Sequence, residues 1–313
     1  MTSFVESLRF RNRPGMKSLV SAISYLSIRI LGFFVRALSL RQARRVACLL
    51  GDFMHKVVGM RREMVYRNIA LSFPGKSPAE IRNIATGVYR NVAVTLIDVL
   101  RFPLIRSRED VAALIDLDPA IFLKGTDNGR KGAVLVSGHF GNWELMALAF
   151  GMMVKPLTII VKGLSNESID RSMNELRTLR GNSVVYDRQA LREGMRLLEE
   201  GGVLAVLSDQ SDPGAKNYID FLGRRATVFQ GAAFFALKAK VPLFVGMCRR
   251  SGDGKYTTDT HEIDTSDLSF NKADIATLTE RYTAVIEDYI RRWPEEWFWL
   301  HNRWKNGGEW QSD

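Results

Sequence analysis

From Lys131 onward, the sequence alternates short apolar runs with longer amphipathic segments. The apolar runs are rich in valine, isoleucine and leucine, which is typical of buried strands. Apolar strands that alternate with helices predict an α/β fold with a mainly parallel sheet, covered by helices on both faces. We expect the strands at 133–136, 157–161, 183–186, 203–207 and 242–247, and the helices from 143 onward and at 167–180, 189–200 and 230–240.

The first of these strands leads into a turn that carries a histidine. Gly138 and Gly141 bracket the turn, and His139 lies between them, before the helical pattern that includes Leu145. His139 is therefore expected at the carboxyl end of a strand, where open α/β sheets bind their ligands. The loop 208–211 follows the fourth strand, so its side chains should emerge on the same rim as His139.

Glu144 follows His139 at a spacing that would place the two side chains about 140° apart on a continuous helix. They can meet only if His139 precedes the helix and Glu144 lies in its first turn, where the helix dipole also favours a carboxylate. A histidine oriented by a carboxylate can take a proton from a substrate hydroxyl. These residues alone fit two alternatives equally well: that catalytic pair, or a hydrogen-bonded core histidine beside a helix-capping glutamate.

Signatures of common cofactors are absent from the sequence. It contains no Gly-x-Gly-x-x-Gly and no P-loop motif, so a nucleotide cofactor is not indicated. Cys48 and Cys248 form neither a disulfide framework nor a zinc-type pair, and the four histidines are scattered. We therefore expect no metal and no cofactor, and a reducing compartment around the catalytic part.

The net charge of +10 is confined to the amino-terminal fifth of the chain. Residues 1–67 hold 13 Lys and Arg against 3 Asp and Glu, whereas the remainder holds 31 of each kind. A basic segment beside an apolar one is typical of attachment to an anionic membrane face, to which each Lys or Arg contributes about 1 kcal/mol. The distribution of charge thus favours an anionic membrane surface, and not nucleic acid, as the partner.

Residues 18–40 form an apolar, helix-compatible stretch interrupted by Arg29 and Arg36, which share one helix face. No charge-free run reaches the roughly 18 residues that indicate a plain membrane span. A helix in the membrane interface accommodates both arginines, whereas a spanning helix would bear about 2.5 to 3.5 kcal/mol for an arginine at its centre. Both alternatives stay open. We expect a membrane-associating helical segment at 1–60, which is no cleavable signal peptide, and the main domain at 61–313.

Four stretches of the sequence resemble one known family. The segment 138–144 (Gly-His-Phe-Gly-Asn-Trp-Glu) resembles the His-x4-Glu signature of the bacterial lipid A late acyltransferases, whose logic is similar to that of glycerolipid acyltransferases with His-x4-Asp. The stretches 61–74, 209–231 and 292–305 resemble other segments of the same family. We expect the dense tryptophans of the last stretch to fix the chain end on the core.

The resemblance implies transfer of a fatty acyl chain from a thioester of acyl carrier protein or coenzyme A to a hydroxyl of a membrane lipid, with a lipid A precursor as the first candidate acceptor. It also implies that the reaction needs no metal and no covalent enzyme intermediate. His139 would deprotonate the hydroxyl, and Glu144 would orient His139. The corresponding location is the bacterial inner membrane, with the acyltransferase domain (61–313) facing the cytoplasm.

Five further residues are candidates for substrate binding in this family's site. Lys162 stands where relatives often have arginine. The single ammonium group of lysine would therefore replace a guanidinium that can form two parallel hydrogen bonds to one anion. The basic members would steer a phosphorylated lipid acceptor or hold an oxyanion. The predicted substrate-binding set is Lys162, Arg180, Asp209, Arg224 and Arg225.

Two other functions compete with acyl transfer. A membrane-binding or nucleic-acid-binding protein that keeps the fold without activity would show salt-dependent binding that survives the loss of His139. A lipid hydrolase or thioesterase could use the same pair of residues on water, but the Gly-x-Ser-x-Gly elbow of such enzymes is absent.

Overall fold

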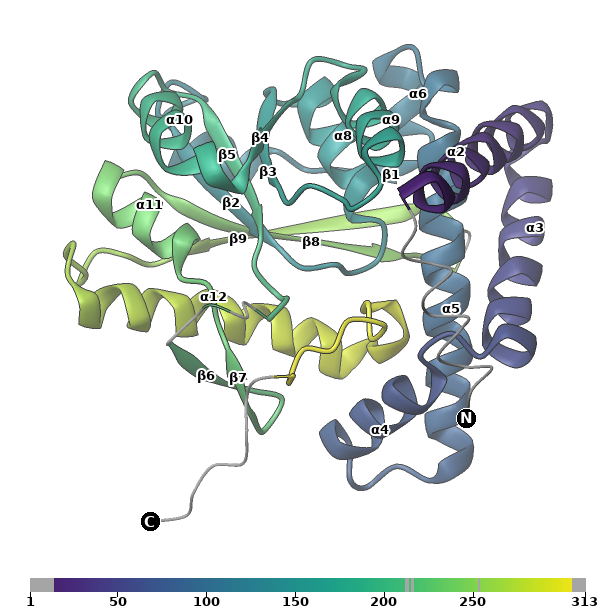
Figure 1. Cartoon of the computed structure of the whole chain (residues 1–313). Helices are drawn as coiled ribbons and strands as arrows, with labels where there is room; N and C mark the ends of the chain where they lie inside the picture. The colour runs from purple at the N-terminus through teal and green to yellow at the C-terminus, as the bar shows by residue number, and fades with distance from the viewer. Residues whose placement is uncertain (1–13, 212–213, 215–216, 253, 306–313) are drawn as a thin grey trace.

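The computed structural model describes residues 14–211, 214, 217–252 and 254–305, and it is centred on a β-sheet (Figure 1). The strands are β1 (Ile115–Asp116), β2 (Ala133–Ser137), β3 (Leu157–Val161), β4 (Ser183–Tyr186), β5 (Val203–Leu207), β6 (Tyr218–Phe221), β7 (Arg224–Thr227), β8 (Leu243–Arg250) and β9 (Tyr256–Ile263). Seven of them form one sheet in the order β1-β9-β8-β2-β5-β3-β4, whereas β6 and β7 form a separate antiparallel hairpin. In the large sheet, all neighbours are parallel except β8 and β9.

Helices precede the sheet and alternate with its strands. The longer ones are α2 (Pro14–Ala37), α3 (Leu40–Phe53), α4 (Arg62–Ser72), α5 (Pro78–Leu100), α8 (Trp143–Met153), α9 (Glu167–Thr178), α10 (Asp187–Glu199), α11 (Gly231–Ala239) and α12 (Lys272–Arg292). The short ones are η1 (Met54–Val58), η2 (Phe102–Leu104), α6 (Arg108–Ala112), α7 (Ala120–Gly125) and η3 (Pro294–Glu296).

Both faces of the sheet are covered. Val134 of β2 belongs to an apolar cluster with Phe235 of α11 and Ile286 of α12, whereas Leu135 belongs to another with Phe150 of α8. Successive side chains of a strand point to opposite faces, so α11 and α12 cover one face and α8 covers the other (Figure 1). The expected α/β fold with a mainly parallel sheet is confirmed, although β9 was not predicted because its sequence is mostly polar.

The amino-terminal helices form a layer beside one end of the sheet. Helix α3 packs along α5, and α5 stands between α3 and the sheet (Figure 1). Ser77 caps α5: its hydroxyl accepts the backbone N–H of Glu80, and the Glu80 carboxylate accepts the backbone N–H of Ser77. Helix α2 packs on α5 through the buried Val35, while Phe33 and Phe34 stay exposed. None of the described helices combines the length and the apolar character of a membrane span.

The segment after α12, up to Lys305, returns to the core. Trp297, Trp299 and Trp304 are buried in a cluster of aromatic rings with Phe221 of β6, and the rings of Trp297 and Trp299 meet edge to face at 4.6 Å. This packing confirms that the tryptophans fix the chain end on the core. It also brings Trp297 beside the loop that follows β2, since Phe140 and Trp297 form an isolated β-bridge.

Candidate active site

The loop that carries His139 has one conformation imposed by its surroundings. It runs from the end of β2 at Ser137 to the start of α8 at Trp143. Gly141 has a φ of 57°, and a Cβ added there would lie 1.7 Å from the carbonyl oxygen of Cys248 on β8. Only glycine tolerates both conditions, so the loop can press its backbone against β8.

Hydrogen bonds from two other elements fix the same loop. The backbone N–H of Gly141 donates to the carbonyl of Glu296 at 2.9 Å. The carbonyl of Gly141 accepts from the Asn91 amide at 3.2 Å and from the Thr95 hydroxyl at 3.1 Å, both on α5. His139 therefore lies in a turn whose backbone is held by contacts with the sheet, with α5 and with η3.

A buried aspartate holds His139 at two points. The carboxylate of Asp209, in the loop after β5, lies 2.8 Å from Nδ1 of His139 and accepts the backbone N–H of His139 at 2.7 Å. The indole N–H of Trp297 donates to the same carboxylate at 2.7 Å. The Asp209 side chain is 1% exposed and that of His139 is 19% exposed. A proton on Nδ1 satisfies the carboxylate, which leaves Nε2 as the basic nitrogen at the exposed edge of the ring.

The surroundings of Asp209 keep it ionised. Burial by itself raises the pKa of a carboxyl group, but the charge of His139 and the hydrogen bonds from His139 and Trp297 outweigh burial and lower the pKa of Asp209 to about 2. An ionised aspartate favours the imidazolium form that His139 adopts after it takes a proton. The arrangement thus has the elements of a general base with an orienting carboxylate.

The expected contact between Glu144 and His139 is wrong. The Glu144 carboxylate accepts hydrogen bonds from Arg177 of α9 at 2.5 and 3.0 Å, and from the indole N–H of Trp143 at 3.3 Å. The reason is geometric: the loop carries the imidazole toward the end of β5, where Asp209 lies, while Glu144 in the first turn of α8 faces α9. Both residues of the signature lie at this loop, and the carboxylate that contacts the imidazole is Asp209.

The exposed edge of His139 is surrounded by polar and aromatic groups. The Gln210 amide nitrogen lies 3.3 Å from Nε2, and the Trp143 ring meets the imidazole edge to face at 5.1 Å. The ring of Phe298 lies 6.0 Å away, and the backbone N–H of Phe298 donates to the carbonyl of His139. The expectation that the loop 208–211 emerges beside His139 is confirmed.

His301 fixes the far side of that loop. Its Nε2 accepts the backbone N–H of Ser211 at 3.2 Å and lies 3.0 Å from the Ser211 hydroxyl. Burial, together with nearby positive charge, lowers the pKa of His301 to about 4, so the ring is neutral and can accept these hydrogen bonds.

The predicted substrate-binding residues lie in three different places. Lys162 is exposed directly after β3, so it lies on the same carboxyl rim of the sheet as His139. Arg180 precedes β4 and is therefore on the opposite rim, where its guanidinium donates to the carbonyl of Ile105 at 2.7 Å. Asp209 is too deeply buried to receive a substrate. Arg180 thus lies away from His139, and Asp209 contacts the imidazole itself, while substrate binding by Lys162 and Arg180 stays a prediction.

Arg224 and Arg225 belong to the β6–β7 hairpin. Arg224 stacks on the ring of Trp304, 3.9 Å from its centroid, and its guanidinium lies 3.4 Å from the Asn68 side chain of α4. Arg225 stacks on the ring of Tyr218, 3.8 Å from its centroid. These contacts give both arginines a structural role in the hairpin, and a contact with substrate stays a prediction for them.

Two residues of the site were missed in the sequence. Trp297 was assigned to the core alone, although its indole donates to Asp209. Arg177, whose guanidinium also donates to Asn174 one turn earlier, had no motif that distinguished it from other surface arginines. The signal for Arg177 was the buried Glu144 itself, because a carboxylate that is 7% exposed requires a charged or hydrogen-bonding partner.

Glu296, whose backbone carbonyl binds the loop of His139, makes the stability of the protein depend on pH. Its carboxylate accepts the backbone N–H of Arg250 at 3.1 Å and is otherwise buried, and burial outweighs this hydrogen bond and raises its pKa to about 7. The native state thus binds a proton that the unfolded chain releases above its ordinary pKa near 4.5. The free energy of unfolding should therefore fall by roughly 3 kcal/mol as the pH rises from about 4.5 to above 7.

We predict that Glu296→Gln removes this dependence, because the amide stays neutral and its oxygen can still accept from Arg250. Denaturant unfolding of both proteins at pH 5 and pH 8 checks it. The free energy of unfolding of the variant minus that of the wild type should be larger at pH 8 than at pH 5 by roughly 3 kcal/mol. The same difference in stability at both pH values would show that the Glu296 carboxyl group does not titrate in this range.

Comparison with known proteins identifies the family. The family model described as bacterial lipid A biosynthesis acyltransferase matches residues 12–306. The chain is 26% identical to the lipid A biosynthesis lauroyltransferase of Escherichia coli over 85% of this chain and 86% of the relative. It is 25% identical to the lipid A biosynthesis palmitoleoyltransferase of Escherichia coli (83% and 85%), and 26% identical to the phosphatidylinositol mannoside acyltransferase of Mycolicibacterium smegmatis (61% and 62%). The chain therefore belongs to the bacterial lipid A biosynthesis acyltransferases and is an acyltransferase.

Proposed function

We propose that this enzyme transfers a fatty acyl chain from a thioester of acyl carrier protein or coenzyme A to a hydroxyl of a membrane glycolipid, with a lipid A precursor as the first candidate. The observation that carries the proposal is the pair of His139 and the buried Asp209, which leaves the basic nitrogen of the imidazole at the solvent edge. Membership in the acyltransferase family supplies the type of reaction.

The geometry supports a direct transfer. Nε2 of His139 takes the proton of the acceptor hydroxyl while the hydroxyl oxygen attacks the thioester carbonyl carbon. The tetrahedral intermediate then collapses, the carbon–sulfur bond breaks, and the leaving thiolate takes the proton from the imidazolium. Asp209 keeps the proton on Nδ1 and stabilises the imidazolium through both steps. The Gln210 amide nitrogen lies 3.3 Å from Nε2 and 3.4 Å from Nδ1, so it does not lie along the lone pair of Nε2 that the acceptor hydroxyl approaches.

The acceptor is proposed to carry negative charge. Lys162 is exposed on the rim where His139 lies, and a lysine there can attract a phosphate of the acceptor as a point charge. Replacing Lys162 with Gln should raise KM for a phosphorylated acceptor and leave kcat for the bound substrate largely unchanged.

The donor and the acceptor can be identified together. The purified full chain is incubated with palmitoyl or lauroyl thioesters of acyl carrier protein or coenzyme A, and with a tetra-acylated lipid A precursor, a phosphatidylinositol mannoside or a lysophospholipid. Mass spectrometry then detects the acylated product. The proposal expects an ester of the lipid A precursor that His139→Ala does not form. If only the other glycolipid or the phospholipid is acylated, that lipid is the acceptor instead of the lipid A precursor. Release of free fatty acid alone would indicate a hydrolase.

We also propose that the enzyme lies on the cytoplasmic face of the bacterial inner membrane, with segment 1–60 as the membrane-associating part. The thioester donors are cytoplasmic molecules, and both cysteines are free thiols. Helices α2, α3 and η1 each expose large apolar side chains, here together called the apolar face, and such exposure suits helices that lie in the membrane interface. Its members are Ile23, Leu26, Ile30, Phe33, Phe34, Val46, Leu49, Phe53 and Val57.

Replacing Leu26 and Phe33 with Ser should weaken binding to phospholipid vesicles by roughly tenfold or more, since both side chains are more than half exposed and would lose their burial in lipid. Leu191 on α10 and Phe229 are exposed to a similar degree and provide the matched control pair. Vesicle sedimentation of the two double variants measures the effect. Equal binding by both variants would show that the membrane contact lies elsewhere.

A further inference from the structure

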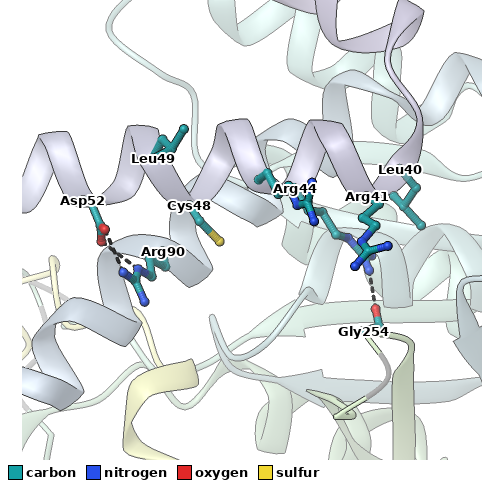
Figure 2. A pocket seen from close by; sticks show the side chains of 9 residues that line it. Leu40, Arg41, Arg44, Cys48, Leu49, Asp52, Arg90 and Gly254 are labelled. Carbon is teal, nitrogen blue, oxygen red and sulfur yellow. Dashed lines mark hydrogen bonds and ion pairs between the residues drawn. The ribbon is translucent and has the colours of Figure 1, made fainter.

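A cavity lies on the other side of α5 from His139. It has a volume of about 850 Å³ and is formed by α3, by Arg90 of α5 and by Gly254 in the β8–β9 turn (Figure 2). Asn91 and Thr95 of α5 face the loop of His139, whereas Arg90 faces α3. The helix therefore separates this cavity from the active site, and a molecule bound in it does not occupy the position of the reacting substrate.

The cavity is lined by four arginines against one aspartate. Two of the arginines are neutralised: Arg44 pairs with the buried Asp98 at 3.0 Å, and Arg90 makes two hydrogen bonds of 2.7 Å to Asp52. Arg44 also donates to the carbonyl of Gly254. Asp52, the one acidic residue among the described residues that line the cavity, is therefore already paired with Arg90.

Arg41 and Arg45 are the two cavity arginines that form no ion pair within the part of the chain that the structure describes. They are four residues apart on α3, so they project from the same face of the helix, and both are exposed. Two guanidinium groups on one wall of a concave site match the geometry of a phosphate group, which accepts several hydrogen bonds from arginine forks.

The cavity also has apolar lining residues. Leu40 and Leu49 lie toward its opposite ends on α3 (Figure 2), and Leu49 is 70% exposed and belongs to the apolar face. A ligand that satisfies both the arginines and Leu49 carries a phosphate and a hydrocarbon chain. An acidic protein surface would supply carboxylates but would leave Leu49 uncovered.

We propose that the cavity binds the phosphate headgroup of an anionic phospholipid, with Arg41 and Arg45 on the phosphate and the acyl chains along Leu49 toward the apolar face. The lipid is a structural ligand that holds the enzyme on an anionic membrane, and it is distinct from the acyl acceptor. The inference builds on the proposed membrane face, but it concerns a defined site that a monomeric lipid in solution can also occupy.

A cysteine in the cavity wall allows binding to be measured. Cys48 lines it and is partly exposed, whereas the other cysteine, Cys248, is fully buried, and burial raises the pKa of its thiol. Modification of the folded full chain by a maleimide should therefore occur at Cys48. A bound lipid covers this thiol, so the rate of modification measures occupancy without vesicles and without the acyl-transfer reaction.

We expect dihexanoyl phosphatidylglycerol, below its micelle concentration, to slow the modification of Cys48 in a saturable manner, by about tenfold at ten times its Kd. Dihexanoyl phosphatidylcholine, whose headgroup is neutral overall, should protect far less. In Arg41→Ala/Arg45→Ala the protection, expressed relative to that variant's own rate of modification without lipid, should be lost. Arg188→Ala/Arg192→Ala removes the same charge at the same spacing from α10 and should keep the protection.

Four results would overturn the assignment. They are equal protection by both lipids, protection that survives Arg41→Ala/Arg45→Ala, equal protection by inorganic phosphate at the same concentration, and protection by acyl carrier protein only. The third would indicate a site for a free phosphate ion, and the fourth a docking site for a protein. Failure of acyl transfer in the product assay would leave this measurement unaffected, so the two proposals can fail separately.

Discussion

His139→Ala is expected to lower kcat for acyl transfer by about 10² to 10⁴, the range typical for loss of a general base. The imidazole is the group whose basic nitrogen reaches the exposed edge of the site, and alanine leaves nothing to take the proton of the acceptor hydroxyl. The rate of product formation, measured by mass spectrometry with a thioester donor, tests this expectation.

The variant should remain folded, because the His139 side chain is partly exposed and the loop is held mainly through Gly141. Circular dichroism and vesicle binding serve as controls. Acyl transfer at a rate near that of the wild type would eliminate His139 as the base. Unchanged membrane binding together with abolished transfer separates the enzyme from a protein that only binds membranes.

Asp209→Asn is expected to lower kcat by on the order of 10³ to 10⁴, because it reverses the tautomer of His139. The backbone N–H of His139 and the indole of Trp297 both donate to one carboxylate oxygen, Oδ2, so the amide oxygen of asparagine has to occupy that position. The amide NH₂ group then faces Nδ1, which must give up its proton. The proton moves to Nε2, and the nitrogen at the exposed edge becomes a donor that cannot act as the base.

Glu144→Gln provides the matched comparison, since it makes the same chemical change in the other carboxylate of the site. Its carboxylate is bonded to Arg177, so we expect a loss of stability of roughly 1 to 3 kcal/mol and a much smaller loss of rate per folded molecule than in Asp209→Asn. Thermal unfolding and kcat measured on the same samples distinguish the two effects. If Glu144→Gln loses as much rate as Asp209→Asn while its stability is unchanged, Glu144 has a direct catalytic role.

The central part of the fold could be predicted from the sequence. Strands β2 and β5 in the middle of the sheet are apolar runs such as Val134–Val136, whose side chains are largely buried on both faces, and this burial excludes polar residues from a strand. Strand β9 is partly exposed and follows its partner β8 after a short turn. Its Thr, Asp and Glu residues occur on both faces and are partly or fully exposed, so no apolar run marked it.

The candidate site was predicted only where the position of a residue depends on its own strand. His139 and Asp209 both follow parallel strands, and neighbouring strands β2 and β5 bring their ends to the same rim. The choice between Glu144 and Asp209 as the partner of His139 depends on how the loop turns between Gly138 and Gly141. That turn is decided by Cys248, Asn91 and Thr95, which are distant in sequence. Sequence spacing favoured the nearer carboxylate.

Trp297 illustrates the same limit. In the sequence it is one tryptophan of an aromatic segment, and its burial was predictable from that composition. Its hydrogen bond to Asp209 requires the chain end to cross beside the loop of His139, through the bridge between Phe140 and Trp297. A contact between residues so far apart in the chain follows from the tertiary packing and not from any local pattern.

The pairing of Asp209 with Nδ1 of His139 can be observed directly by NMR of the protein with isotope-labelled histidine. An imidazole N–H that is strongly hydrogen-bonded to a buried carboxylate gives a proton resonance far downfield, and His139→Ala assigns it by its disappearance. We expect this resonance in the wild type and in Glu144→Gln, and its loss in Asp209→Asn. A resonance that persists in Asp209→Asn and disappears in Glu144→Gln would contradict the pairing and return Glu144 to the role of orienting carboxylate.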